Sequence, residues 1–342
     1  MPCLDGLVRH PSGDRSRFPP IEGSRDSLVP MDEVEAVDHS VLDETSETGR
    51  RRSCLPAVIR ALRPKQWVKN VLVFAAPLAS GRLLEWPVLR ATLLSLAAFI
   101  LVSAFVYLVN DTRDLAEDRQ HPTKRFRPIA AGEVSVPVAL VLAAVCLAGS
   151  LTIGFATSLM LGVVVVVYAL LQFTYSLWFK HRPIVDLALV ALGFLLRALA
   201  GGVASGIPLS QWFLLVASFG SLFMVAGKRY SELVQLGSEA GTRPSLASYS
   251  PDYLRFIWAA SATLVVTFYS LWAFDQRGTG LWTAPWPAIS IAPFTLAILS
   301  YARDIDRGEA GEPENVVLHD PMLIALGLLW VVSVVLAVVV PA

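Results

Sequence analysis

Apolar stretches separated by short polar connections make up most of the chain from about residue 70 to its end. Each stretch holds close to twenty residues, and a helix of that length matches the roughly 30 Å hydrocarbon core of a bilayer. We therefore expect an all-α, polytopic membrane protein with nine transmembrane helices. The predicted spans are 69–84, 88–109, 136–155, 157–179, 184–204, 210–227, 253–274, 284–302 and 321–340. The first span has the weakest pattern, because Pro77 and Gly81 lie inside it.

Residues 1–55 have a different character. They are polar, rich in Pro, Ser, Asp and Glu, and they lead into the basic run RRRSC. The basic start and apolar core of a secretory signal peptide are absent from this stretch. We predict a disordered cytosolic extension over residues 1–55 and an integral membrane domain over residues 56–342.

Composition and charge agree with a membrane bundle and predict its orientation. Charged residues make up 16% of the chain, whereas soluble proteins carry about 25%. Basic residues gather before the first span, in 110–128, and in every second connection after that. Because basic connections favour the cytosol, nine spans place the amino terminus inside and the carboxyl terminus outside. We expect a multi-pass protein of the plasma (inner) membrane whose polar constellations face the cytosol.

The densest polar constellation is NDTRDLAEDRQHPTKRFRP, residues 110–128. If the second span continues as a helix, Asn110, Asp111, Asp114 and Asp118 share one of its faces. Carboxylates at such spacing repel one another unless a cation lies between them, and Mg²⁺ takes one or two carboxylates together with phosphate oxygens. Bases follow the acids, among them His121, Lys124, Arg125 and Arg127.

Acids for a metal followed by bases for phosphate are what a diphosphate leaving group requires. The sequence therefore predicts that Asp111, Asp114 and Asp118 bind Mg²⁺ and that Asn110 binds a phosphate oxygen or the metal through its amide. The alternative is a solvated helix end in which Arg113 and Arg119 offset the acids.

Other candidate substrate ligands lie on the same predicted face. Tyr175, Lys180, Arg182 and Asp186 surround the end of the fourth span, where aromatic and basic residues are also ordinary membrane anchors. Lys228, Arg229, Tyr230 and Glu232 end the sixth span, where two cations suit an anionic group or simply mark the cytosolic flank. Lys69 and Asn70 are placed at the cavity mouth.

Arg197 lies well inside the fifth span, in GFLLRALAGG. A charge at that depth usually faces a polar cavity, which predicts a phosphate ligand. The alternative is an arginine whose head reaches the outer surface near Ser205.

A helical bundle with NDxxDxxxD at the end of its second span resembles the UbiA superfamily of intramembrane prenyltransferases, over about residues 60–340. Aromatic prenyltransferases of that superfamily carry a second aspartate motif after the sixth span, and this chain has KRYSEL (228–233) there instead. RPKQWVKNVLVFAAPL (63–78), residues 110–135 and YSLWFKHRPIVD (175–186) look like the phosphoribosyltransferase branch.

That branch resemblance implies an Mg²⁺-dependent transfer of 5-phosphoribose from phosphoribosyl pyrophosphate to decaprenyl phosphate, for the synthesis of cell-wall arabinan. If the resemblance holds, Lys124, Arg127 and Lys180 bind the sugar phosphate or the diphosphate of the donor. Lys228 and Arg229 receive the lipid phosphate, which Arg197 reaches from below. We expect a direct displacement that inverts the anomeric carbon.

Two other functions stay open. One is the transfer of a prenyl group from a prenyl diphosphate to an aromatic acceptor, and the remoter one is transport. We expect no nucleic-acid partner. The isoprenoid length of the acceptor, the number of magnesium ions and a homo-oligomeric assembly are left open by the sequence.

Overall fold

The computed structural model describes residues 56–179, 182–236, 248–275, 286–312, 316–317 and 319–339, and these are helical throughout apart from their connections. The extension predicted over residues 1–55 lies outside the described residues. The elements, in order, are α2 (Ala57–Ala61), the 3₁₀ helix η1 (Pro64–Phe74), α3 (Ala75–Ala79), α4 (Trp86–Arg113), α5 (Leu115–Gln120), the 3₁₀ turn η2 (Lys124–Phe126), α6 (Val136–Thr157), α7 (Leu159–Thr174), the π-helical turn η3 (Tyr175–Phe179), α8 (Val185–Ser205), α9 (Gln211–Leu236), α10 (Pro251–Asp275), α11 (Trp286–Ile289), α12 (Ile291–Asp306) and α14 (Pro321–Val339).

Seven helical segments of the described chain are long and apolar enough to cross a membrane. They are Trp86–Arg113, Val136–Thr157, Leu159–Phe179, Val185–Ser205, Gln211–Gln235, Pro251–Asp275 and Trp286–Asp306. These confirm the predicted spans from 88–109 to 284–302. The stretch Pro321–Ala337 of α14 is apolar but shorter.

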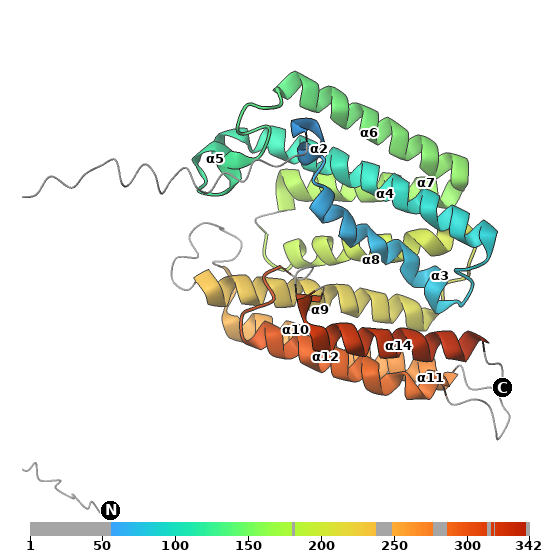
Figure 1. Cartoon of the computed structure of the whole chain (residues 1–342). Coiled ribbons are helices and arrows are strands. Elements are labelled where there is room, and N and C mark those ends of the chain that lie inside the picture. The colour runs from blue at the N-terminus through green and yellow to red at the C-terminus, as the bar shows by residue number, and fades with distance from the viewer. Residues whose placement is uncertain are drawn as a thin grey trace, which may run out of the picture. The chain divides into compact units, whose positions relative to one another are not determined.

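The first predicted span, 69–84, does not form a single α-helix. The segment is the 3₁₀ helix η1 followed by the short α3, and it runs beside α8 (Figure 1). Gly201 of α8 allows this contact, because a Cβ atom there would lie 1.9 Å from the carbonyl oxygen of Val73. A 3₁₀ helix is narrower than an α-helix and rises about 2.0 Å per residue, so η1 lies against α8 as a thin, extended segment.

Local sequence signals mark the first and last residues of several helices. Proline at the first turn starts both α4 and α6, where its missing N–H is not needed. Ser158 caps α7, its hydroxyl accepting a hydrogen bond from the amide of Leu161 at 3.0 Å. Gly206 ends α8 in the left-handed region with φ of 66°.

The helices form two groups with α8 between them (Figure 1). On one side, Phe99 of α4 and Leu161 of α7 belong to a buried cluster shared with η1 and α8. On the other side, Phe223 of α9, Leu254 of α10 and Ile305 of α12 belong to a second cluster with α8. The central helix α8 is therefore packed from both sides.

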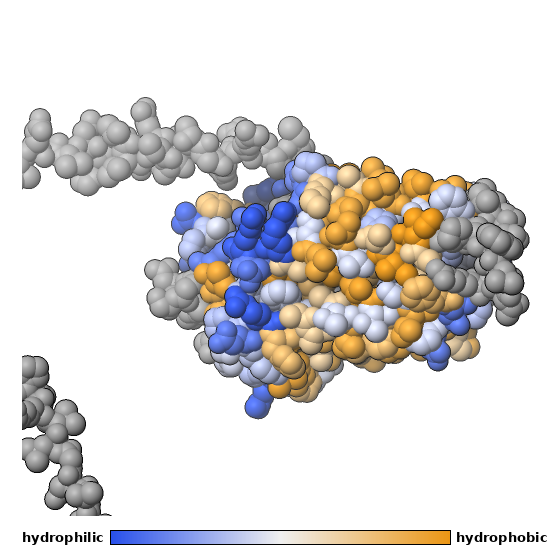
Figure 2. Space-filling view, turned by 90° about the horizontal axis from the view of Figure 1, so that it is seen from below, coloured by the Kyte–Doolittle hydropathy of each residue, from blue (hydrophilic) through white to orange (hydrophobic). Residues whose placement is uncertain are grey.

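The surface separates into an apolar band and a polar end. Figure 2 shows apolar side chains over the middle of one face and hydrophilic side chains gathered at the end where α5 lies in Figure 1. Large apolar side chains such as Val141, Leu328 and Trp178 are more than 60% exposed, as expected for a surface that faces lipid. We call the end that carries α5, the end of α4 and the start of α8 the mouth end.

Candidate functional site

The motif acids lie at the mouth end, where the last turn of α4 leads into α5. α4 includes Asp111, is interrupted at Asp114 and resumes as α5 at Leu115. The backbone stays close to helical, because Asp114 N donates to Asn110 O and Asp118 N donates to Asp114 O, both at 2.8 Å. The spacing of seven residues, about two helical turns, therefore brings Asp111 and Asp118 to one side, as the sequence predicts.

Two arginines bind these acids, and we call Arg63, Asp111, Asp118 and Arg127 the mouth cluster. Asp111 and Asp118 are 3% and 2% exposed. Arg127 Nη1 donates to Asp111 Oδ1 at 3.1 Å and to Asp118 Oδ2 at 2.6 Å, so both carboxylates face one nitrogen. Arg63 also donates to Asp111 Oδ1. Buried carboxylates need such compensation.

The geometry of the acid pair fits a divalent cation. The described residues contain no group of three or more His, Cys, Asp or Glu side chains arranged to hold a metal, and binding of Mg²⁺ by Asp111, Asp114 and Asp118 together stays a prediction. Asp111 and Asp118 alone nevertheless converge on one point, and Mg²⁺ in a diphosphate complex needs only one or two protein carboxylates. These two side chains are the ones that fit magnesium.

Asn110 and the end of α7 continue the site across the mouth end. Asn110 Oδ1 accepts a hydrogen bond from Ser176 Oγ at 2.6 Å. Arg113 donates to the carbonyl oxygen of Ser176. Tyr175, the neighbour of Ser176 in η3, lies close enough to Arg229 of α9 for an electrostatic interaction. The π-helical turn therefore lies between the end of α4 and α9.

A second charged group, which we call the α9 cluster, comprises Asp186, Lys228, Arg229, Glu232 and Tyr249. Arg229 lies 3.5 Å from Asp186 and 3.1 Å from Glu232, which is 3.7 Å from Lys228 Nζ. Asp186 is fully buried and accepts a hydrogen bond from the Tyr249 hydroxyl at 2.6 Å. Burial raises the pKa of Tyr249 and the hydrogen bond to Asp186 raises it further, so this hydroxyl remains a donor.

The remaining predicted residues of the mouth end are more dispersed. His121 Nδ1 accepts from the amides of Thr123 and Lys124 in the loop before η2. Arg182 is exposed, Lys69 is half-buried in η1, and Lys180 lies outside the described residues. Tyr230 is buried and faces α10, where its hydroxyl accepts a hydrogen bond from Arg255 at 2.7 Å. The structure thus does not bring Tyr230 into the α9 cluster.

Arg197 and Asn70 lie deeper in the bundle, in what we call the deep cluster with Ser103 and Tyr168. Arg197 is 6% exposed. Its Nε donates to Asn70 Oδ1 at 2.9 Å and its Nη2 to the Tyr168 hydroxyl at 2.5 Å. Ser103 precedes Asp111 by eight residues on α4, about 12 Å along the axis. Arg197 therefore neither reaches the outer surface nor joins the phosphate ligands predicted at the mouth end.

Sequence reasoning missed several residues that the structure brings into these clusters. The sequence pattern places Arg63 only among the basic residues before the first span, and it assigns no role to Tyr249 or Ser176. The signal for Arg63 was available in the motif that begins at that residue, RPKQW. Tyr249 follows a connection far from Asp186 in the sequence, so only the packing of the chain could identify it.

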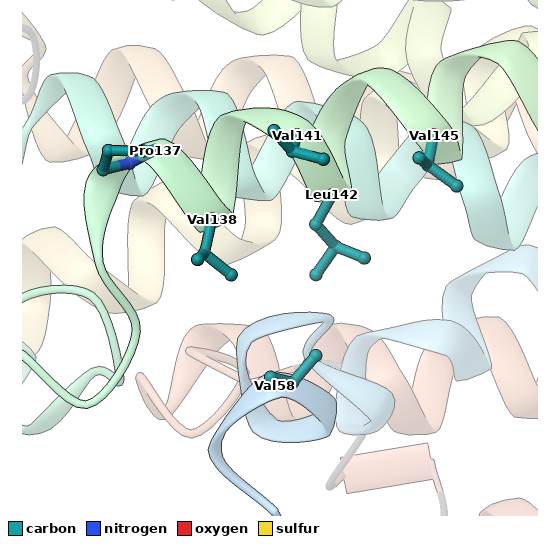
Figure 3. A pocket seen from close by; sticks show the side chains of 6 residues that line it. All are labelled: Val58, Pro137, Val138, Val141, Leu142 and Val145. Atoms are coloured by element: carbon teal, nitrogen blue, oxygen red, sulfur yellow. The ribbon is translucent and has the colours of Figure 1, made fainter.

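An apolar groove lies near the mouth end between α2 and α6 (Figure 3). It has a volume of about 360 Å³. Its lining residues are Val58, Pro137, Val138, Val141, Leu142 and Val145. Since these side chains offer no charge or hydrogen-bond donor, the groove cannot bind a phosphate group, and the charged chemistry belongs to the mouth and α9 clusters.

Comparison with known proteins assigns a family to this geometry. The sequence profile of the UbiA prenyltransferase family matches residues 71–327. Decaprenyl-phosphate phosphoribosyltransferase of Corynebacterium glutamicum is 48% identical over 306 residues, which cover 87% of this chain and 92% of the relative. The protein of the same name from Mycobacterium tuberculosis H37Rv is 50% identical over 283 residues, 81% of this chain and 92% of the relative.

Solved structures share the fold at lower identity. A UbiA homolog from Archaeoglobus fulgidus bound to DMAPP and Mg²⁺ matches with a TM-score of 0.63 and 20% identity, over 82% of this chain and 98% of that one. A UbiA homolog from Aeropyrum pernix K1 matches with a TM-score of 0.58 and 17% identity, over 80% and 98% of the two chains.

Proposed function

The chain belongs to the UbiA prenyltransferase family, and on this premise we propose that it is a phosphoribosyltransferase. It moves 5-phosphoribose from phosphoribosyl pyrophosphate to the phosphate of a polyprenyl lipid, decaprenyl phosphate being the first candidate, and releases pyrophosphate. The observation that carries the proposal is the mouth cluster, in which two buried carboxylates converge on one point between two arginines. The relatives at 48–50% identity carry the name of this activity.

The residues of the mouth cluster suit phosphoribosyl pyrophosphate, the donor of the phosphoribosyl group. Asp111 and Asp118 would hold magnesium, which when bound neutralises charge on the leaving diphosphate. Arg63 and Arg127 offer planar guanidinium groups to phosphate oxygens, and Lys124 lies in the same loop as Arg127. Lys228 and Arg229 of the α9 cluster are the cations proposed for the lipid phosphate.

The reaction needs no strong base. One oxygen of the lipid phosphate forms a bond to the anomeric carbon of the ribose while the bond from that carbon to pyrophosphate breaks. The attacking oxygen is already an anion, so no proton has to be removed. We propose a single displacement with inversion and an oxocarbenium-like transition state. Buried donors around the diphosphate favour charge separation in that state.

The α9 cluster favours phosphoribosyl pyrophosphate over a prenyl diphosphate as the substrate that donates the transferred group. The end of α9 carries the cations Lys228 and Arg229 with the single acid Glu232, where the aromatic prenyltransferases resembled by this sequence carry a second aspartate motif. Asp186 comes from α8 and is already bound by Tyr249 and Arg229. A second metal-binding acid group would need these contacts to be broken.

We propose further that the mouth end faces the cytosol across the plasma membrane, with the amino terminus inside and the carboxyl terminus outside. Support comes from the basic side chains at this end and from the direction of the helices, since α4 ends and α6 begins there. A nine-pass topology counts α2, η1 and α3 together as the first crossing and α14 as the last. Phosphoribosyl pyrophosphate is a cytosolic diphosphate, so its site must open on that side.

Transfer of label tests the proposal directly. Purified protein is incubated with magnesium, radiolabelled phosphoribosyl pyrophosphate and decaprenyl phosphate, and label is counted in the lipid phase. We expect labelling that requires magnesium and falls at least about 100-fold in Asp118→Asn. Glu117→Gln is the matched control, because it removes the same charge from an exposed neighbour on α5. The proposal is wrong if no label moves while a prenyl diphosphate is consumed with an aromatic acceptor.

A further inference from the structure

Arg127 occupies the point that the two buried carboxylates share. Its Nη1 atom lies 3.1 Å from Asp111 Oδ1 and 2.6 Å from Asp118 Oδ2. A divalent cation bound by both carboxylates needs the same place. Two positive groups cannot share that place, because they would repel and overlap. Binding of an ion to this acid pair therefore requires the guanidinium of Arg127 to move.

The two arginines of the mouth cluster differ in how they are held. Arg63 lies over the ring of Tyr107, its Cζ 4.9 Å from the ring centre, and its backbone adopts a left-handed φ of 53°. Such a backbone persists only when the surrounding structure fixes it. The two side chains are similarly exposed, at 25% and 29%, but Arg127 follows η2 in ordinary extended backbone. Arg127 is the more readily moved of the two.

We propose that Arg127 is an exchangeable internal cation, a role that rests on the proposed function. The guanidinium holds Asp111 and Asp118 in the free protein. It would pass from the carboxylates to the diphosphate when Asp111 and Asp118 hold the magnesium of the substrate complex. A guanidinium binds phosphate oxygens as readily as carboxylate oxygens, through the same planar fork. The negative charge of the acid pair and the positive charge of Arg127 are thereby both compensated in each state.

The exchange makes metal affinity depend on the diphosphate. A free divalent ion must displace Arg127 and leave it without an anion, so it binds weakly. An ion that arrives with a diphosphate binds tightly, because the diphosphate becomes the new partner of Arg127. The site therefore selects the magnesium complex of its substrate over free magnesium.

Binding of Mn²⁺, which carboxylate sites accept in place of Mg²⁺, tests this without any transfer reaction. Free Mn²⁺ is measured by electron paramagnetic resonance in titrations of the full chain in nanodiscs. We expect Arg127→Gln to tighten Mn²⁺ binding about tenfold, since 1.4 kcal/mol of competition corresponds to that factor. Added pyrophosphate should tighten Mn²⁺ binding strongly in the native protein and much less in Arg127→Gln.

Arg119→Gln is the matched control, because Arg119 follows Asp118 directly but donates to the carbonyl oxygen of Ala130 at 3.3 Å. We expect it to change Mn²⁺ affinity less than twofold. Equal tightening in both variants would reduce the effect to general electrostatics and overturn the proposal. Unchanged or weaker binding in Arg127→Gln would also overturn it, because Arg127 would then only position the acids.

Arg127→Lys covers the case in which Arg127→Gln does not fold. It keeps the charge but loses the planar fork, so Mn²⁺ alone should bind as weakly as in the native protein while the pyrophosphate effect shrinks. A pyrophosphate effect as large as in the native protein would contradict the transfer of Arg127 to the diphosphate. These measurements do not depend on the transferred group, so they can succeed even if phosphoribosyl labelling fails.

Discussion

The mouth cluster and the deep cluster each hold buried charge, and they stabilise it in opposite ways. At the mouth end, Asp111 and Asp118 meet the full charges of two arginines whose side chains are 25% and 29% exposed. In the deep cluster, the guanidinium of Arg197 donates hydrogen bonds to the neutral groups of Asn70, Tyr168, Ser103 and Gly193. Tyr168 also places its ring 4.8 Å from the guanidinium carbon.

The difference separates a binding site from a structural connection. Opposite charges close to solvent can exchange partners when a charged ligand arrives, as proposed for Arg127. The deep cluster joins η1, α4, α7 and α8 through one guanidinium, and each bond to a neutral dipole is made inside the protein. A cation at that depth is costly unless its surroundings compensate it, so we infer that the hydrogen bonds of Arg197 position η1, and with it Arg63.

The largest expected effect is on activity and comes from the mouth cluster. Asp111→Asn should lower the transfer rate at least about 100-fold, because a neutral amide holds both the arginines and a divalent ion poorly. Its melting temperature should change little, because Arg127 keeps Asp118 as a partner. Steady-state labelling and tryptophan fluorescence melts measure the two quantities. A large loss of stability with unchanged activity would reverse the assignment of the two clusters.

The next effect is on stability and comes from the deep cluster. Arg197→Ala leaves Asn70 and Tyr168 without their buried partner and opens a cavity, so the free energy of unfolding should fall by about 3 kcal/mol. Arg90→Ala, which removes an exposed arginine from α4, is the control and should change it by less than about 0.5 kcal/mol. Denaturant titration in mixed micelles gives both values. A more stable Arg197→Ala would mean that the buried charge is a net cost retained for binding.

Packing between η1 and α8 predicts a smaller loss. In Gly201→Ala the new Cβ atom would meet the carbonyl oxygen of Val73, and backbone cannot move aside as a flexible side chain would. We expect a loss of about 2 kcal/mol. Gly327→Ala in α14 is the matched control: its Cβ atom meets nothing within 4 Å, so it should be neutral or stabilising by up to about 1 kcal/mol. Equal effects in the same denaturant titrations would contradict the close contact of η1 with α8.

The smallest effect belongs to the exposed ion pair before α4. Arg82 donates to Glu85 at 2.8 Å and lowers the pKa of that carboxyl. A lowered pKa in the folded state contributes stability above the unfolded value, and this contribution disappears as the pH falls through the folded value. Because both side chains are exposed, Arg82→Gln should give no resolvable change of melting temperature at neutral pH. A clear change would show that charge pairs outside the mouth cluster also matter.

Much of the fold follows from the sequence because hydrophobic length and charge alternation are local properties. The predicted spans from 88–109 to 284–302 correspond to α4 through α12 within about four residues, except that α9 continues nine residues beyond the predicted end at 227. The continuous helix expected over 69–84 is instead divided into η1 and α3, and η1 contacts α8 at Gly201, more than a hundred residues away. Hydropathy cannot detect such a contact.

The sequence by itself determined that the protein is a helical membrane bundle and that its motif acids lie together at one end, because helical spacing alone brings Asp111 and Asp118 to one side. Only the tertiary structure decided which cations meet those acids and which do not. Arg63, Tyr249 and Arg197 find their partners across helices that are distant in the chain. The free energy of a buried charge depends on its neighbours in space, and folding alone brings those neighbours together.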